Sequence, residues 1–162
     1  MPLVIRDVIP QDLPAVLALN ESELPHVGKI DMAQVLWFAA HADYFRVARK
    51  DEHLAGFLIG LRPGSSYTSL NYRWFCERYV DFAYVDRIVV ARHARGQGLG
   101  ARLYDDFAES MPASISLITC EVNTIPPNEQ SMGFHMNLGF TRVGTLSTEA
   151  GQKEVALLLK RF

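Results

Sequence analysis

The sequence predicts an α/β (α+β) fold in which helices flank a mixed, mostly antiparallel sheet. Strand-like and helical patterns follow one another in the order β-α-α-β-β-β-α-β-α-β-β. One strand-helix-strand crossover, residues 82–122, is expected to be parallel and right-handed, whereas the hairpins on either side are expected to be antiparallel. With 162 residues, 49% of them hydrophobic, we expect a single domain spanning 1–162.

The first half of the chain is predicted to form a strand, two helices and a hairpin. Residues 3–8 alternate like a strand, and Pro10 opens a helical pattern. The proline and glycine of the loop before Asp31 oppose one continuous helix, so a second helix is expected over 32–42. Asp31 is suited to cap it. The turn composition "DEH" then predicts a tight antiparallel hairpin. Its strands are residues 44–50 and 54–61.

The second half of the chain predicts strands that alternate with helices and a closing hairpin. A helix follows three alternate glycines, and Pro112 ends it because proline cannot continue a helix. The predicted elements are a strand over 82–91, a helix to about Met111, a strand over 115–122, a helix over 129–138 and strands over 141–148 and 153–161.

Composition excludes several classes of function. Sixteen basic against eighteen acidic residues, with no basic stripe, disfavour a nucleic-acid partner. No apolar stretch approaches the roughly 20 residues of a membrane span, and no secretory pattern opens the chain. Cys76 and Cys120 lack CxxC spacing and fit reduced thiols, and the histidines lack paired-ligand spacing. We therefore expect a cytoplasmic protein with no membrane partner and no metal.

The stretch "RIVVARHARGQGLGARLYDDF", residues 87–107, resembles a phosphate-binding turn. N–H groups at a helix start lack intrahelical partners, and the helix dipole adds roughly half a positive charge there. Gly96, Gly98 and Gly100 keep side chains away from these amides, and Arg95 and Arg102 can add positive charge. The alternative is a glycine-rich connection that binds nothing.

The same turn also satisfies the dinucleotide pattern G-x-G-x-x-G/A. Glu121 follows it by about 20 residues, as a ribose-binding acid would, so an NAD-dependent protein is one interpretation. The order of elements opposes it, because the part of the chain after the turn contains one parallel strand and a hairpin, too little for a doubly wound sheet. The turn also lacks the Lys-Ser/Thr of a P-loop.

Two motifs resemble those of the GCN5-related N-acetyltransferase (GNAT) superfamily. "RGQGLG" looks like its R/Q-x-x-G-x-G/A motif, and "VDRIVVARHA" resembles the strand that leads into it. "NEQSMGFHMNLGF", 128–140, is similar to the family's N-x-x-A/S-x-x-hydrophobic-Tyr-x-x-x-Gly-Phe segment. The resemblance implies the acyl-CoA N-acyltransferase fold, whose central parallel strand pair splays around the coenzyme.

This resemblance implies acetyl-CoA as the acyl-donor cosubstrate. Backbone groups of three strand residues are expected to pair with the pantetheine arm, the turn to hold the pyrophosphate, and the second motif to line the other side of the arm. These positions are Ile88, Val89 and Val90; Arg95, Gly96, Gln97, Gly98, Leu99, Gly100, Ala101 and Arg102; and Asn128, Phe134 and His135.

The resemblance also implies catalytic positions. His135 stands where the family often has a tyrosine that protonates the departing thiolate, and it either donates that proton or only positions the coenzyme. Asp86 and Glu121 compete with water as the base that takes the amine proton. The structural alternatives are that Asp86 pairs with nearby arginines and that Glu121 caps a loop.

The expected function is transfer of an acetyl group to a primary amine of a small molecule, amino acid or peptide. A coenzyme A-binding module without catalysis is the alternative, because the tyrosine is missing. The aromatic-rich residues 62–80 are unlike the family. They are either a lid over the acceptor, near the 21–30 loop, or a hydrophobic flap that packs on the core or on a second subunit of a homodimer.

Overall fold

The computed structural model describes residues 2–162 and contains all the predicted strands and helices, plus one further α-helix and three short 3-10 helices, labelled η1 to η3. The elements divide into two compact units. One unit comprises the described residues of Met1–Leu61 together with Arg87–Ser110, and the other comprises Arg62–Asp86 and Met111–Phe162. Strand β4, Ala83–Val90, runs from the second unit into the first. That residues 1–162 form one domain stays a prediction.

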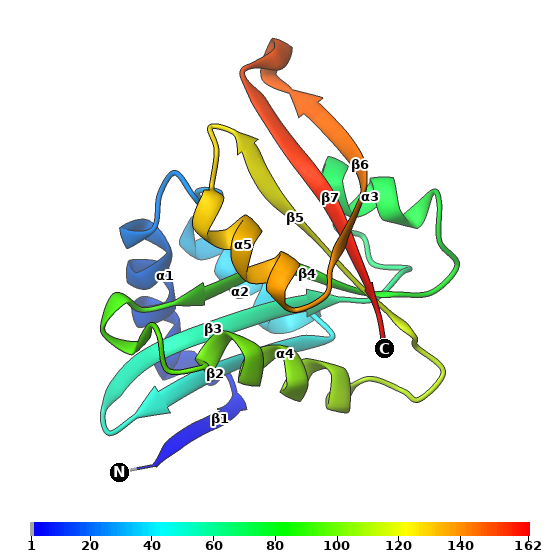
Figure 1. Ribbon diagram of the computed structural model, residues 1–162. Helices are drawn as coiled ribbons and strands as arrows, with labels where there is room; N and C mark the ends of the chain where they lie inside the picture. Colours follow the sequence, from blue (N-terminus) through cyan, green and yellow to red (C-terminus); the bar gives the residue numbers. More distant parts are fainter. Residues whose placement is uncertain (1) are drawn as a thin grey trace. The chain divides into compact units, whose positions relative to one another are not determined.

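The first unit contains three antiparallel strands, β1 to β3, that pair in chain order. Figure 1 shows β2 and β3 as the predicted hairpin. The elements are β1 (Leu3–Asp7), η1 (Pro10–Asp12), α1 (Leu13–Ser22), α2 (Met32–His41), β2 (Tyr44–Lys50), β3 (His53–Leu61), η2 (Arg92–Ala94) and α4 (Leu99–Ser110). The predicted cap of α2 is confirmed, because Asp31 accepts a bond from the Gln34 backbone at 2.8 Å and the Gln34 side chain accepts from the Asp31 backbone at 2.9 Å.

Helix α4 is anchored through a glycine of β3. Leu103 and Phe107, four residues apart on α4, are fully buried. A Cβ at Gly60 would overlap the Phe107 ring, so glycine is what lets the helix approach the strand. The Tyr44 ring also meets the edge of Phe107, with 4.9 Å between centroids. This packing fixes α4, the helix that follows the glycine turn, against β3.

The second unit contains the parallel strand pair and the closing hairpin. Its strands pair in the order β4, β5, β7, β6. The parallel β4–β5 pair and the antiparallel β6–β7 hairpin were predicted, and β7 also pairs antiparallel with β5. Together with the antiparallel strands of the first unit, this confirms a mixed, mostly antiparallel α/β fold. The remaining elements are α3 (Leu70–Cys76), β5 (Leu117–Ile125), α5 (Glu129–Asn137), β6 (Thr141–Thr148), η3 (Glu149–Gly151) and β7 (Lys153–Arg161).

Helix α3 is a correction to the prediction of a long connection over 62–80. Ser69 caps it by accepting a bond from the Tyr72 backbone at 3.4 Å, and Tyr72 and Phe75 are buried at helical spacing. A Cβ at Gly144 would overlap the Trp74 ring, so α3 lies directly against β6. The segment is therefore largely a packed part of its own unit.

Residues 2–162 were expected to contain no membrane span, no metal site and no disulfide. Within this range no helix is both long and apolar enough to cross a membrane. In the same part of the chain, no group of three or more His, Cys, Asp or Glu side chains is arranged to hold a metal ion. Both cysteines are free thiols, with Cys120 buried and Cys76 exposed.

Candidate functional site

The glycine turn of the first unit has the backbone that a phosphate cradle needs. Gly96 and Gly98 have φ of 74° and 77°, a left-handed conformation that side chains other than glycine rarely adopt. A Cβ at either residue would meet no atom within 4 Å, so the space beside the turn is open. The Arg102 backbone donates to the Gly98 carbonyl at 3.1 Å, which leaves the preceding amides of the turn without helical partners. The turn can therefore present backbone donors to an anion.

The Arg95 side chain does not add free positive charge to the glycine turn, although this was predicted. Its guanidinium forms an ion pair with Glu23, a buried carboxylate just after α1, and its Nε donates to the Val90 carbonyl at 3.2 Å. Arg102 is exposed on the first turn of α4. Of the two arginines predicted to add positive charge, Arg95 thus neutralises Glu23, and Arg102 lies on the surface.

A second arginine fastens the segment between α1 and α2. Arg87 donates to the side-chain oxygen of Asn20 at 3.0 Å and to the Gly28 carbonyl at 2.9 Å. Asn20 is fully buried and itself donates to Gly28 at 3.1 Å. Neither the bond of Asn20 to Arg87 nor the pairing of Glu23 with Arg95 was predicted, because the partners are far apart in the sequence. These contacts attach the 21–30 loop to the strand and turn of the predicted coenzyme residues.

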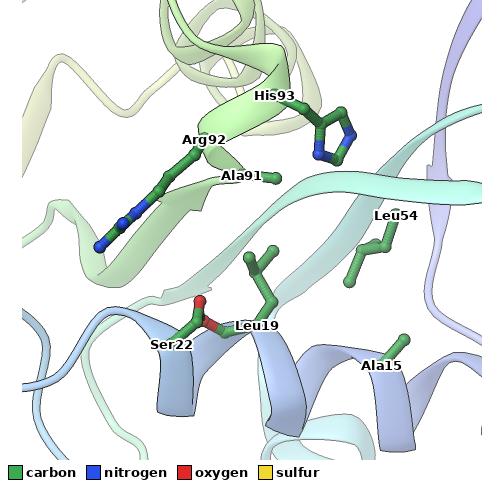
Figure 2. Close-up of a pocket in the computed structure, with 7 residues that line it drawn as sticks. All are labelled: Ala15, Leu19, Ser22, Leu54, Ala91, Arg92 and His93. Carbon is green, nitrogen blue, oxygen red and sulfur yellow. Dashed lines mark hydrogen bonds between the residues drawn. The ribbon is translucent and has the colours of Figure 1, made fainter.

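A pocket of about 570 Å³ lies in the first unit, just before the glycine turn. Figure 2 shows side chains of α1 facing Leu54 and the residues around the start of η2 across it. None of the predicted coenzyme residues lines the pocket. Its lining residues are Ala15, Leu19, Ser22, Leu54, Ala91, Arg92 and His93.

The two predicted base candidates of the second unit each accept a hydrogen bond from a tyrosine. The Tyr84 hydroxyl donates to both oxygens of Glu121, at 2.9 and 2.8 Å, and the Tyr67 hydroxyl donates to Asp86 at 2.5 Å. Burial raises the pKa of Tyr84 well above its usual value, and the charges of Glu121 and Asp86 add to the effect. Tyr84 therefore stays a protonated donor. The sequence signal that could have found it is its spacing of two residues from Asp86, which places both on one strand face.

Helix α5 contains the remaining predicted residues. Asn128 is its N-cap and accepts a bond from the Ser131 backbone at 3.2 Å. The His135 side chain is buried, with its ring edge-on to the half-buried Phe134 and to Phe140 at 5.1 and 5.2 Å between centroids.

The protonation of His135 follows from its surroundings. Its Nδ1 lies 2.7 Å from the Ser131 carbonyl, which can only accept, so Nδ1 carries the proton and Nε2 of the neutral ring is an acceptor. Burial lowers the pKa of His135, and the bond to Ser131 opposes this only in part. The general-acid role requires the imidazolium form, which burial disfavours, and it stays a prediction.

Solved structures share this fold over nearly the whole chain. Ard1 from Thermoplasma volcanium has a TM-score of 0.78 at 18% identity, covering 99% of this chain and 98% of that one. Arabidopsis thaliana NAA60 in complex with a bisubstrate analogue has 0.77 at 15%, covering 99% and 98%. Arabidopsis thaliana Naa50 in complex with the bisubstrate analogue CoA-Ac-MVNAL has 0.75 at 16%, covering all of both chains. At these identities the likeness is one of fold.

Membership of a family comes from the sequence match. The model of the acetyltransferase (GNAT) family matches residues 13–140, which include the glycine turn and the second motif. No curated protein matches the chain in sequence. The chain therefore belongs to the GNAT family of acetyltransferases, as its two motifs predicted.

Proposed function

We propose that this acetyltransferase uses acetyl-CoA to acetylate a primary amine of a small molecule, amino acid or peptide. The observation that carries the proposal is the glycine turn, in which Gly96 and Gly98 leave open space beside backbone donors at the start of α4. Support also comes from Naa50, a neighbour in fold that was solved with a CoA-peptide analogue. Acetyl-CoA supplies the thioester when it is bound.

The residues proposed to hold the coenzyme are those predicted from the sequence, with backbone amides in place of the Arg95 side chain. The turn 95–102 is proposed to meet the pyrophosphate through backbone amides, because the Arg95 guanidinium already neutralises Glu23. Residues 88–90 are proposed to pair with the pantetheine amides as an added strand would. In the second unit, Phe134 and the face of α5 after its Asn128 cap are proposed to contact the arm.

The proposed chemistry is direct attack of a neutral amine. Asp86 or Glu121 takes the proton that the amine loses, directly or through water, as the C–N bond forms and the C–S bond breaks. A proton returns to the sulfur from water or from His135. The products are the acetylated amine and free coenzyme A. The contribution of the protein is mainly alignment and removal of one proton.

A thiol-release assay with acetyl-CoA and a panel of primary amines tests this proposal. We expect release that depends on an amine, together with protection from thermal unfolding by acetyl-CoA and none by NAD. If coenzyme binds but no amine increases release, and His135→Ala leaves this unchanged, the chain is a coenzyme-binding module. Protection by NAD in place of acetyl-CoA would support the dinucleotide interpretation.

A further inference from the structure

Two carboxylates lie where the parallel ladder of the second unit ends. The last pair of this ladder joins Tyr84 to Thr119, and Asp86 and Glu121 each follow that pair by two residues. Because alternate residues of a strand point to the same face, both carboxylates lie on the face that carries Tyr84. The bonds from Tyr84 to Glu121 agree with this placement.

Each carboxylate is oriented by a hydrogen bond from a tyrosine, and both carboxylates raise the pKa of Tyr84. Tyr84 donates to Glu121 and Tyr67 donates to Asp86. The charges of Glu121 and Asp86 both contribute to the raised pKa of Tyr84, so each acid lies near the Tyr84 phenol. Asp86, Glu121 and Tyr67 are only half-buried. A polar molecule can therefore reach the cluster.

The segment that carries Tyr67 is held in place by its own hydrogen bonds. The Tyr72 hydroxyl donates to the Arg62 carbonyl at 2.6 Å and accepts from the Ser65 backbone at 3.2 Å. The Ser65 hydroxyl in turn accepts from the Tyr67 backbone at 3.1 Å. The Tyr67 and Tyr72 rings lie 5.7 Å apart. These hydrogen bonds hold the segment so that the Tyr67 hydroxyl lies within bonding distance of Asp86.

The two carboxylates of this cluster favour a positively charged ligand group. A carboxylate has about four lone-pair positions and can accept bonds from several donors at once, such as a phenol together with an ammonium group. Two carboxylates on one face attract a cation and repel a second anion, and the repulsion is strong at a half-buried site. The ring of the half-buried Tyr67 adds further attraction for a cation.

We propose that Asp86 and Glu121, oriented by Tyr67 and Tyr84, form an acceptor subsite that selects primary amines lacking a neighbouring carboxylate. Free amino acids are excluded, because their carboxylate lies within a few bonds of the amine and is repelled by Asp86 and Glu121. Amines whose neighbouring group is neutral are accepted. This inference rests on the proposed function and names the class of amine. Tyr67 and Tyr84 are positioning residues, which act through the carboxylates.

Matched acceptor pairs test the subsite. The pairs are L-alaninamide with L-alanine and tyramine with L-tyrosine, assayed at saturating acetyl-CoA with rates expressed per unprotonated amine. We expect kcat/KM at least about tenfold higher for the member without a carboxylate, since one like-charge contact at a partly buried site has this effect. Asp86→Asn and Glu121→Gln should each reduce that preference.

The variant Tyr67→Phe keeps the test independent of a lost catalytic group. It removes one hydroxyl, and we expect a KM for tyramine or alaninamide raised several-fold with kcat within about twofold, because the carboxylate loses its orientation. Coenzyme A affinity should stay unchanged. Tyr79→Phe is the control, since it removes a hydroxyl from the same segment without touching the cluster.

The outcomes separate this inference from the proposed function. Equal kcat/KM within both pairs, or a preference that survives both carboxylate variants, would overturn the subsite while leaving the acetyltransferase function intact. A Tyr67→Phe variant that behaves like Tyr79→Phe would remove Tyr67 from it. If coenzyme A binds but no amine is acetylated, the proposed function fails and this inference fails with it.

Discussion

Gly98→Ala is the substitution that separates backbone strain from loss of a ligand site. Gly98 has a φ of 77° and open space around its absent Cβ, so alanine meets strain but no clash. A left-handed alanine costs about 1–2 kcal/mol. The smaller entropy of the unfolded chain returns about 0.4–1 kcal/mol. The net loss of unfolding free energy is therefore between about 0 and 1.6 kcal/mol, and the variant should fold.

The control for this substitution is Gly151→Ala in the β6–β7 turn. Gly151 has a φ of 85° and the same open surroundings, so it should lose a similar unfolding free energy. Only Gly98→Ala places a methyl group where the pyrophosphate is proposed to approach. We expect its dissociation constant for coenzyme A to rise about tenfold or more, equivalent to about 1.4 kcal/mol.

Urea unfolding and isothermal titration calorimetry measure the two effects separately. Wild-type coenzyme affinity in a folded Gly98→Ala variant would refute the assignment of the phosphate to this turn. Equal weakening by Gly151→Ala would show that strain alone, and not the ligand, is responsible.

Three further predictions concern contacts that the structure reveals. Glu23→Gln should lower the unfolding free energy by about 1–3 kcal/mol, because it leaves the partly exposed Arg95 without its charged partner, whereas the exposed Glu21→Gln should change it little; equal urea midpoints for the two variants would contradict this. Since the pKa of Tyr84 is raised by folding, its contribution to stability is fully present below pH 10.0 and falls as pH rises above that value. In Tyr84→Phe the unfolding free energy should fall less steeply with pH in this alkaline range. An unchanged slope would contradict the raised pKa of Tyr84. Gly60→Ala should cost about 1–3 kcal/mol through overlap with Phe107, and Gly28→Ala, which meets no atom within 4 Å, should cost far less; similar melting temperatures for the two would contradict the packing of α4 on β3.

Most of the fold was predictable because its signals are local. The closing strands 141–148 and 153–161 have the predicted bounds, since two strand-like stretches flank a glycine turn. The cap of α2 was predictable from Asp31 alone. Helix α3 was missed because a helix of seven residues is too short to show an apolar period, and its cap Ser69 stands in a stretch typical of a loop.

The candidate site was predictable only where its residues are contiguous. The turn 95–102 is one stretch of chain, and its conformation follows from its glycines. The ion pair of Arg95 with Glu23 joins residues 72 positions apart, and no local pattern announces it. The same holds for Tyr67 and Asp86, 19 positions apart. These contacts depend on how strands and insertions pack.

The sequence by itself determined the order of elements, the glycine turn and membership of the acetyltransferase family, because each depends on residues close together in the chain. Tertiary structure alone decided which group Arg95 neutralises, why His135 is held as a neutral ring, and that phenols hold both candidate bases. The physical reason is that charge, protonation and hydrogen bonding at a buried site depend on neighbours brought together from distant parts of the chain.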